Sequence, residues 1–352
     1  MTFGNCSCQA TCEDPRNENG CHNTCTEEYA CVCKEGYLLR GNDCIRAQDC
    51  QCFVQGAGVI QNGESYINPD CLRRCSCNGN QLTCESYQCG TGETCVEVEG
   101  AYQCECDDGF VRDGRNCVLA VDCKTLYDSG VTTNGVYTIK PSSWSGSGFQ
   151  VYCEMESNGG GWTVIFQRRV DGTVNFYRNW ASYKQGFGSL THEFWLGNDK
   201  IHAITNQKTY QLRVDAVNSQ GTSIFNTYSS FRITDENDKY RLRLGSKSGN
   251  TGGDAMYYNN GKQFSTHNED NDGGTTYHCA QKHRGAWWYT DYLYYYYNYC
   301  FKWRVGSYYR YCSNSNLNGD YQRSGVQGLF FYDGNSGQHC GITRSEMKLR
   351  PV

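Results

Sequence analysis

The sequence predicts a mixed α+β domain with antiparallel sheets and long loops, preceded by small disulfide-rich modules. Nineteen of the 25 cysteines lie between Cys6 and Cys117, and the other six are spread over the chain from Cys123 onward. All seven tryptophans lie in that second part, which has enough apolar mass for an ordinary core. It also contains short alternating runs of β-branched and aromatic residues, separated by Gly, Asn, Asp and Ser.

The density of cysteines in the first third indicates the compartment in which the protein works. Modules of this size cannot bury enough apolar surface and depend on cross-links, which persist only in an oxidising environment. We therefore expect a secreted, extracellular protein. The first residues lack the apolar core of a secretory signal, and the cysteine count is odd. We expect the natural chain to start further upstream, where the partner of one thiol has been lost.

Charge and hydropathy argue against two classes of partner. The net charge is −5 and both signs are mixed along the chain, so there is no basic stripe for nucleic acid and no polybasic arm for anionic lipid. No apolar run approaches the roughly 18 residues that a membrane-spanning helix requires. We expect neither nucleic acid as a partner nor a membrane span.

Local patterns in the second part predict individual elements. The alternating runs 162–166 and 210–215 predict strands. Helices are expected near 180–187 and near 194–203. With so few helices, the class is antiparallel sheet with long loops.

Sequence motifs for catalysis are missing. The run Gly159–Gly161 precedes a tryptophan and lacks the Lys-Ser/Thr pair that grips a nucleotide phosphate. No Gly-x-Ser-x-Gly elbow occurs, and the seven histidines show no paired metal-ligand spacing. We therefore expect a binding protein and not an enzyme.

The cysteines of residues 1–50 resemble those of the trypsin-inhibitor-like domain. That family has ten cysteines in five bridges, and nine are present here: Cys6, Cys8, Cys12, Cys21, Cys25, Cys31, Cys33, Cys44 and Cys50. The resemblance implies that the missing first cysteine pairs with Cys31. It also places the protease-facing loop of inhibitory members at residues 21–25, where three polar residues make a poor substrate mimic. We favour a structural module and keep a serine protease inhibitor as a weaker alternative.

Two further modules are expected before the large domain. Residues 51–83 resemble the cysteine-rich extension that follows this module in extracellular proteins, and the pairing of its four cysteines cannot be read from the sequence. Residues 84–118 resemble an epidermal-growth-factor-like unit. Calcium-binding forms of that unit have Asp or Asn where this chain has Glu97, so we assign no calcium to it.

Residues 121–352 resemble the fibrinogen-like domain. The segments that carry the resemblance are Gly135-Val-Tyr-Thr-Ile-Lys-Pro141, Phe149-Gln-Val-Tyr-Cys153, Gly159-Gly-Gly-Trp-Thr163, Phe176-Tyr-Arg-Asn-Trp180, Glu193-Phe-Trp-Leu-Gly-Asn198, Ser315-Asn-Leu-Asn-Gly319 and Glu346-Met-Lys-Leu-Arg-Pro351. The resemblance implies two bridges, Cys123 to Cys153 and Cys279 to Cys312.

An acidic loop before Cys279 is a candidate calcium site. Closely spaced carboxylates on a turn-prone loop offer the hard oxygen ligands that Ca²⁺ requires, although such a run is by itself more often a solvated surface. The resemblance implies Ca²⁺ binding here, with carboxylates from Asp270 and Asp272 and backbone carbonyls near Gly274 and Thr276. The loop is one residue longer than the usual form, which affects the register of the carbonyl ligands but not the assignment of the two aspartates.

Lectin-like members of the family hold an acetyl group in a pocket beside this loop. The resemblance implies the ligand-binding residues His283, Tyr311, Cys312, Ser313 and Tyr332, with a cis peptide bond between Tyr311 and Cys312. An apolar wall for the methyl and donors for the carbonyl would bind such a group. The match is incomplete, because His283 replaces an aromatic residue and Ser313 replaces a histidine.

A tyrosine-rich insertion lies between the two cysteines of the second bridge. It contains ten tyrosines from Tyr289 to Tyr311 and also Cys300, and the tail contains Cys340. These two cysteines suggest a third bridge, Cys300 to Cys340. If Cys300 pairs outside the chain instead, the protein is a covalent homo-oligomer. Tyrosines with interspersed basic residues are typical of recognition loops, and a hairpin turning at Gly306-Ser307 is the structural alternative.

These features support two classes of function. The leading hypothesis is an innate-immune-type lectin that binds acetylated or otherwise anionic glycans with the help of Ca²⁺, through loops between Asp270 and Tyr332. The alternative is an extracellular-matrix or receptor-binding protein whose ligand is another protein.

Overall fold

The computed structural model describes residues 2–5, 10–12, 14, 29–54, 58–78, 81–157, 159–274, 277–290, 292–294, 309–332, 334 and 341–352. The chain forms two compact units, of which the first comprises Met1–Asp107 with Gly114–Cys117 and the second Asp108–Asp113 with Val118–Val352. We call them the cysteine-rich unit and the large unit. Within the described residues, every helix is too short or too polar to cross a lipid bilayer.

The cysteine-rich unit is built from short antiparallel ribbons. β3 pairs with β4, β5 with β6 and β10 with β11, and β7, β8 and β9 form a three-stranded sheet. The elements are β1 (Thr2–Asn5), β2 (Tyr29–Val32), β3 (Tyr37–Arg40), β4 (Asp43–Arg46), η1 (Ala47–Asp49), β5 (Cys52–Val54), β6 (Gly58–Ile60), β7 (Ser65–Ile67), β8 (Arg73–Asn78), β9 (Gln81–Ser86), β10 (Glu93–Val98) and β11 (Ala101–Cys106). β12 (Phe110–Asp113) belongs to the large unit, and β13 (Asn116–Leu119) has residues in both units.

Disulfides supply much of the buried interior of this unit. Its two described apolar clusters consist of Cys52, Val54, Ile60, Cys75 and Cys77, and of Cys12, Leu38 and Cys50. The described bridges are Cys12–Cys50, Cys33–Cys44, Cys52–Cys77, Cys71–Cys95, Cys75–Cys84, Cys89–Cys104 and Cys106–Cys117. Loop 21–25, the predicted protease-facing loop, lies outside the described residues.

The bridges differ from those of a self-contained six-cysteine unit at 84–118. Cys84 bonds to Cys75, and Cys95 bonds to Cys71, so two bridges cross the predicted boundary between 83 and 84. The reason is strand register, because Cys75 and Cys84 lie directly opposite each other on β8 and β9. Cysteine spacing does not show which strands are neighbours, so the sequence alone could not predict this pairing.

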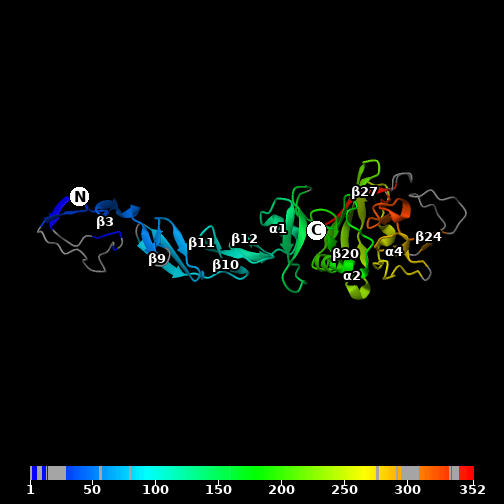
Figure 1. Cartoon of the computed structure of the whole chain (residues 1–352), viewed down its shortest axis with the longest axis horizontal. Helices are drawn as coiled ribbons and strands as arrows, with labels where there is room; N and C mark the ends of the chain where they lie inside the picture. Colours follow the sequence, from blue (N-terminus) through cyan, green and yellow to red (C-terminus); the bar gives the residue numbers. More distant parts are fainter. Residues whose placement is uncertain are drawn as a thin grey trace. The chain divides into compact units, whose positions relative to one another are not determined.

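The large unit is organised around one long antiparallel sheet with the strand order β14-β15-β16-β27-β19-β20-β21. Two of these strands, β20 and β27, are labelled in Figure 1. Its elements are α1 (Cys123–Asp128), β14 (Gly135–Ile139), β15 (Phe149–Glu154), β16 (Trp162–Arg169), α2 (Trp180–Gln185), β17 (Phe187–Gly188), β18 (Phe194–Trp195), α3 (Asn198–Thr205), β19 (Tyr210–Asn218), β20 (Ser223–Ile233), η2 (Glu236–Asp238), β21 (Leu242–Leu244), β22 (Lys247–Gly249), η3 (Tyr257–Asn259), α4 (Cys279–Lys282), β23 (Tyr292–Tyr294), β24 (Tyr309–Tyr311), β25 (Ser315–Asn316), η4 (Gly325–Gln327), β26 (Phe330–Phe331) and β27 (Ile342–Pro351).

Strand β27 lies at the centre of this sheet. It pairs with β16 on one side and with β19 on the other, so that Leu349 lies opposite both Thr163 and Leu212. Along β19, buried and half-buried residues alternate, as expected for a strand with one face on the core. The predicted strands at 162–166 and 210–215 are confirmed as parts of β16 and β19.

The two predicted helices form, but one begins later than expected. Helix α2 starts at Trp180, where the side chain of Asn179 accepts a hydrogen bond from the backbone of Ser182 and caps the helix. The prediction of a helix from 194 was wrong for its first residues. Phe194 and Trp195 pair with β16 as strand β18, and Gly197, at a φ of 114°, separates them from α3.

Aromatic rings fill the core of the large unit. Phe166 stacks on Phe231 with ring centroids 5.0 Å apart, and Trp195 stacks on Phe264 at 5.6 Å. Trp288 packs against Phe264 at 5.2 Å. All five side chains are at most 1% exposed, so each contributes the large burial energy of an aromatic residue.

Arg169 and Glu193 form a buried ion pair in the large unit. Glu193 is fully buried, and its carboxylate accepts hydrogen bonds from the backbone N–H groups of Val170, Gly172 and Val174. Nε of Arg169 lies 3.5 Å from this carboxylate. Nη1 of Arg169 donates to the carbonyl of Gly319 at 2.9 Å. The pair therefore ties the end of β16 to the segment that follows the second bridge.

Candidate functional site

The bridges predicted for the large unit are confirmed, and one of them is the framework of the candidate site. Cys123 bonds to Cys153, and Cys279 bonds to Cys312 with 5.7 Å between their Cα atoms. Cys279 opens the short helix α4, and Cys312 follows β24. The N–H of Thr290 donates to the carbonyl of Cys312 at 2.9 Å, which holds the two ends of the insertion together.

The acidic loop brings Asp270 and Asp272 together, as the sequence predicts. Asp272 is 4% exposed, and its two oxygens accept hydrogen bonds of 2.8 Å from the N–H groups of Gly274 and Cys279. Nδ1 of His278 lies 3.9 Å from a carboxylate oxygen of Asp270. Ligand atoms of Asp270, Asp272 and His278 all lie within 4.8 Å of one another.

Electrostatics at this loop favour a cation. Burial raises the pKa of Asp272 above its ordinary value, the hydrogen bonds from Cys279 and Gly274 lower it, and the charge of Asp270 raises it further. Two carboxylates this close repel each other, and a divalent cation would remove that repulsion. The donor set fits Ca²⁺, since Asp270 and Asp272 offer hard oxygens, as the carbonyl of Gly274 also can. Thr276 lies outside the described residues.

Sequence reasoning missed His278 in this cluster. Its Nδ1 is buried and has no hydrogen-bond partner among the described residues. Imidazole is a poorer ligand than oxygen for Ca²⁺, so His278 is better placed to contact Asp270 than to hold the metal. Its position next to Cys279 was the available signal, because the bridge fixes that residue beside the acidic loop.

His283, predicted to bind ligand, is a packed residue in the structure. It is 5% exposed, and its ring lies 5.4 Å from that of Tyr289 and 6.0 Å from that of Phe330. Burial lowers the pKa of His283 to about 4, and a backbone hydrogen bond with Val326 offsets this only in part. The ring is therefore neutral at physiological pH.

The residues around Cys312 are also buried and form hydrogen bonds within the domain. Cys312 and Ser313 are each 2% exposed, and the Ser313 hydroxyl accepts hydrogen bonds from the Asn259 side chain and from the N–H of Ser315. The predicted cis bond between Tyr311 and Cys312 is wrong, because no peptide bond in the described segments is cis. A non-proline cis bond costs about 3 to 4 kcal/mol, and here the trans form lets Cys312 pair with Thr290.

Tyr332 packs onto the backbone of the large unit. A Cβ atom added at Gly253 would lie 2.6 Å from the Tyr332 ring, so the ring fills the space that this glycine leaves. The N–H of Tyr332 donates to the carbonyl of Asn314. Ligand binding by Tyr332, His283, Tyr311, Cys312 and Ser313 stays a prediction, and the structure gives four of them packing or hydrogen-bonding roles.

The tyrosine-rich insertion is described only at its base. Tyr292 pairs with Tyr311 and Tyr294 with Tyr309, so β23 and β24 form an antiparallel pair. The proposed turn at 306–307 and the proposed bridge from Cys300 to Cys340 lie outside the described residues.

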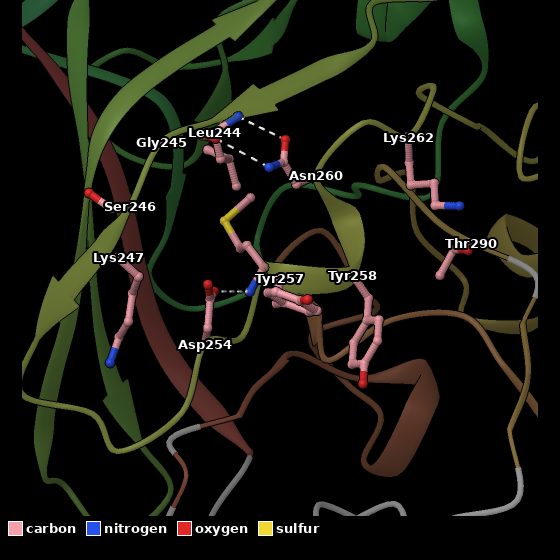
Figure 2. Close-up of a pocket in the computed structure, with 11 residues that line it drawn as sticks. Leu244, Gly245, Ser246, Lys247, Asp254, Tyr257, Tyr258, Asn260, Lys262 and Thr290 are labelled. Atoms are coloured by element: carbon pink, nitrogen blue, oxygen red, sulfur yellow. Dashed lines mark hydrogen bonds between the residues drawn. The ribbon is translucent and has the colours of Figure 1, made fainter.

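An open cavity lies close to the bridge, at a place the sequence did not indicate. Its volume is about 620 Å³, and Figure 2 shows the residues that line it. They come from β21, β22 and the turn between them, from the segment 254–262 that contains η3, and from Thr290. The cavity is linked to the bridge through Thr290, which bonds to Cys312, and through Asn259 of η3, which bonds to Ser313. The lining residues are Leu244, Gly245, Ser246, Lys247, Asp254, Met256, Tyr257, Tyr258, Asn260, Lys262 and Thr290.

Comparison with protein families decides the nature of the large unit. The model of the C-terminal globular domain of fibrinogen beta and gamma chains matches residues 119–352. The chain belongs to this fibrinogen-like family. Two further models match the cysteine-rich part: the trypsin inhibitor like cysteine rich domain at 1–50 and the TILa domain at 51–105.

Known relatives share the fibrinogen-like domain. The chain is 41% identical to ryncolin-4 of Cerberus rynchops over 252 residues, which is 70% of this chain and 64% of that protein. It is 41% identical to human angiopoietin-related protein 7 over 236 residues, 65% of this chain and 61% of the relative. It is 40% identical to mouse tenascin-R over 243 residues, 69% of this chain and 16% of the relative. The chain thus spans less than two thirds of each of these relatives.

Solved structures give the same result for the fold. The fibrinogen-like globe domain of human ANGPTL2 superposes with a TM-score of 0.56 at 37% identity, covering 66% of this chain and 98% of that one. The corresponding domain of human ANGPTL6 gives a TM-score of 0.55 at 32% identity, covering 66% of this chain and 95% of that one. The predicted fibrinogen-like fold is therefore confirmed.

Proposed function

We propose that this chain is a secreted recognition protein whose fibrinogen-like domain binds acetylated or anionic glycans with the support of Ca²⁺. The observation that carries the proposal is the convergence of Asp270 and Asp272 beside the Cys279–Cys312 bridge. The similarity to ryncolin-4 supports a recognition role within this family. Secretion is supported by the number of disulfides, which require an oxidising compartment.

A cation bound to Asp272 would act on the binding surface through Cys279 and its bridge. Asp272 accepts the N–H of Cys279, so a cation bound to Asp272 also fixes the start of α4. Through the Cys279–Cys312 bridge, that order extends to Cys312 and its neighbour Thr290. Ca²⁺ would therefore preorganise the loops that face a ligand, without itself having to contact the glycan.

Calcium titration and glycan binding test the proposal together. We expect saturating Ca²⁺ to raise the melting temperature of the domain by about 5 to 10 °C, as a ligand at about 100 times its Kd would do. Asp270→Asn and Asp272→Asn should abolish this rise and weaken binding to acetylated glycans on an array. Glu269→Gln is a matched control, because Glu269 is a neighbouring carboxylate outside the cluster. Unchanged calcium affinity in both Asp variants would refute the site.

A protein ligand is the second candidate function. The similarity to the angiopoietin-related and tenascin proteins favours it, and so does the abundance of tyrosine in the insertion, since tyrosine suits contacts with proteins. Tight binding to a protein on cell surfaces or in matrix, with no glycan retained on an array, would select this function. An inhibition assay with trypsin-like and chymotrypsin-like enzymes tests the weaker candidate, a serine protease inhibitor in residues 1–50.

A further inference from the structure

The cavity of about 620 Å³ has a composition suited to a defined ligand (Figure 2). We call it the tyrosine–lysine cavity, after Tyr257, Tyr258, Lys247 and Lys262. Its volume lies within the range of sites for small molecules. It combines aromatic surface with two cations, and the apolar residue Met256 is also part of the lining.

Two tyrosines form an aromatic platform in this cavity. The rings of Tyr257 and Tyr258 meet edge to face with centroids 5.1 Å apart, and Tyr257 is 67% exposed. The platform is held firmly from below, because Asn259 of the same turn is fully buried. Its amide donates to the carbonyl of Trp288 and to the hydroxyl of Ser313, both at 2.8 Å. Tyr257 is thus a large apolar surface, open to solvent, on a turn whose backbone is held by Asn259.

Two lysines lie on opposite sides of this platform. In Figure 2, Lys247 lies on the side of Asp254 and Tyr257, and Lys262 on the side of Tyr258 and Thr290. Among the residues that the structure describes, neither ammonium forms an ion pair with a carboxylate, although Lys247 donates to the carbonyl of Thr251. Each lysine therefore keeps donors for an anion.

The carboxylate in the cavity is already engaged. Oδ1 of Asp254 accepts from the hydroxyl of Tyr228 at 2.7 Å and from the N–H of Met256 at 3.0 Å. Asn260, the remaining amide in the lining, exchanges hydrogen bonds with the backbone of Leu244. These neutral donors leave the negative charge of Asp254 in place, so two lysines against one aspartate still give the lining an excess of positive charge.

We propose that the tyrosine–lysine cavity binds an acidic oligosaccharide, with a sugar ring on Tyr257 and carboxylate or sulfate groups on Lys247 and Lys262. Sugar rings present C–H faces that pack on aromatic rings, and lysine ammonium groups form charge-assisted hydrogen bonds with anionic oxygens. Two cations on either side of a ring platform match a ligand that carries its charges at intervals along a chain of rings.

This site shares its class of ligand with the proposed function but does not depend on the calcium loop. Asp270 and Asp272 are not among the residues that line the cavity. Thr290 is the lining residue that bonds to Cys312 of the bridge, whereas Lys247 and Tyr257 come from β22 and η3. Removal of Ca²⁺ should therefore leave the lysines and tyrosines of this site in place, and failure of either proposal would be seen separately.

The test measures binding of a heparin-derived hexasaccharide to the full chain by calorimetry, in EDTA, at low and high salt. We expect Lys247→Gln and Lys262→Gln each to weaken binding about tenfold, the usual effect of one charge-assisted hydrogen bond. Tyr257→Ala should weaken it several-fold. Affinity should fall with salt, and a neutral β-glucan hexasaccharide should bind far more weakly.

Matched controls distinguish binding in the cavity from non-specific electrostatic attraction of the hexasaccharide to the protein surface. Arg232→Gln removes an equal charge from an exposed position on β20 outside the cavity, and Asp270→Asn removes the calcium ligand. Both should bind the hexasaccharide as the parent chain does, and all variants should keep the parent melting temperature. The proposal is overturned if Arg232→Gln matches the lysine variants, or if the lysine variants bind normally. Equal binding of a poly-glutamate peptide with no effect of Tyr257→Ala would assign the cavity to acidic peptides instead.

Discussion

The two units of this chain solve the same problem of stability in different ways. In the cysteine-rich unit, half-cystines are a large share of the buried residues, and the described apolar clusters contain few other side chains. In the large unit, a continuous core of aromatic and aliphatic side chains surrounds only two described bridges. One unit is stabilised by restricting its unfolded state, whereas the other is stabilised by burying apolar surface.

The comparison shows where sequence change can be tolerated. A unit stabilised by bridges can vary its exposed residues freely, provided that each cysteine keeps its partner. A unit stabilised by its core can lose a bridge more easily than a buried ring. The residues proposed to bind ligand in the fibrinogen-like domain therefore lie on a framework whose stability does not depend on disulfides alone.

The largest difference between the two units is expected when their disulfides are reduced. We expect dithiothreitol to unfold the cysteine-rich unit at 25 °C, because each lost bridge removes about 2 to 4 kcal/mol and seven are described. Tryptophan fluorescence should still report a cooperative transition for the large unit, since all seven tryptophans lie beyond Cys123. Limited proteolysis with peptide mapping checks the first half of this prediction. Equal sensitivity of both units would contradict the comparison.

The second largest difference is expected in the stability that each unit loses when one aromatic ring is removed. Phe166→Ala is expected to lower the free energy of unfolding of the large unit by about 3 to 5 kcal/mol, because Phe166 is fully buried and stacks on Phe231. Phe53→Ala is the matched change in the cysteine-rich unit, where Phe53 is 64% exposed, and should change stability by less than about 0.5 kcal/mol. Denaturant titration measures both, and similar losses would refute this assignment of roles.

The buried ion pair predicts a specific acid sensitivity of the large unit. Burial raises the pKa of Glu193, but hydrogen bonds from Val170, Val174 and Gly172 and the charge of Arg169 outweigh it, so the pKa lies below its ordinary value of 4.5. A carboxyl with a lowered pKa stabilises the fold above its unfolded pKa, and this stability is lost as the pH falls through the folded value.

Glu193→Gln tests this pair directly. We expect it to cost about 3 kcal/mol near pH 7, because it leaves Arg169 buried without its counter-charge. The difference from the parent chain should shrink below about pH 4.5, where Glu193 in the unfolded chain is protonated. Melting curves between pH 3 and pH 7 check this, and a difference that is constant with pH would contradict it.

The smallest effect is expected for a surface ion pair of the large unit. Lys124 and Asp128 form an i,i+4 pair on α1, with side chains 36% and 59% exposed. Asp128→Asn should change the free energy of unfolding by less than about 0.5 kcal/mol, since exposed pairs are screened by water and salt. A larger loss in denaturant titration would show that surface charge, and not the core alone, stabilises this unit.

The two units also differ in how far the sequence could predict them. Cys123, Cys153, Cys279 and Cys312 could be paired because whole segments around them resemble one family. Among Cys71, Cys75, Cys84 and Cys95, the partners depend on the register of β8 and β9 and on which strands meet, and spacing contains neither. The resemblance to a six-cysteine unit therefore did not predict the partners of Cys84 and Cys95, which are set by the neighbouring strands.

At the candidate site, the residues of the acidic loop could be predicted from the sequence, whereas the cavity formed by distant segments could not. The Asp270 and Asp272 carboxylates are two residues apart, so their meeting follows from local geometry. The tyrosine–lysine cavity brings Lys247 and Tyr257 together through the β21–β22 turn and η3, and no sequence period relates such residues. The packing of His283 beside Phe330 depends on tertiary structure in the same way.

The central position of β27 has a consequence for the biogenesis of the protein. Residues 342–351 complete the sheet between β16 and β19, both of which are synthesised long before them. Until β27 has been synthesised, the edges of β16 and β19 that pair with it have no hydrogen-bond partner strand. The ribbons of the cysteine-rich unit, in contrast, find their partners within a few tens of residues. The first unit can therefore pair its strands early in synthesis, whereas the sheet of the second stays incomplete until β27 has been made.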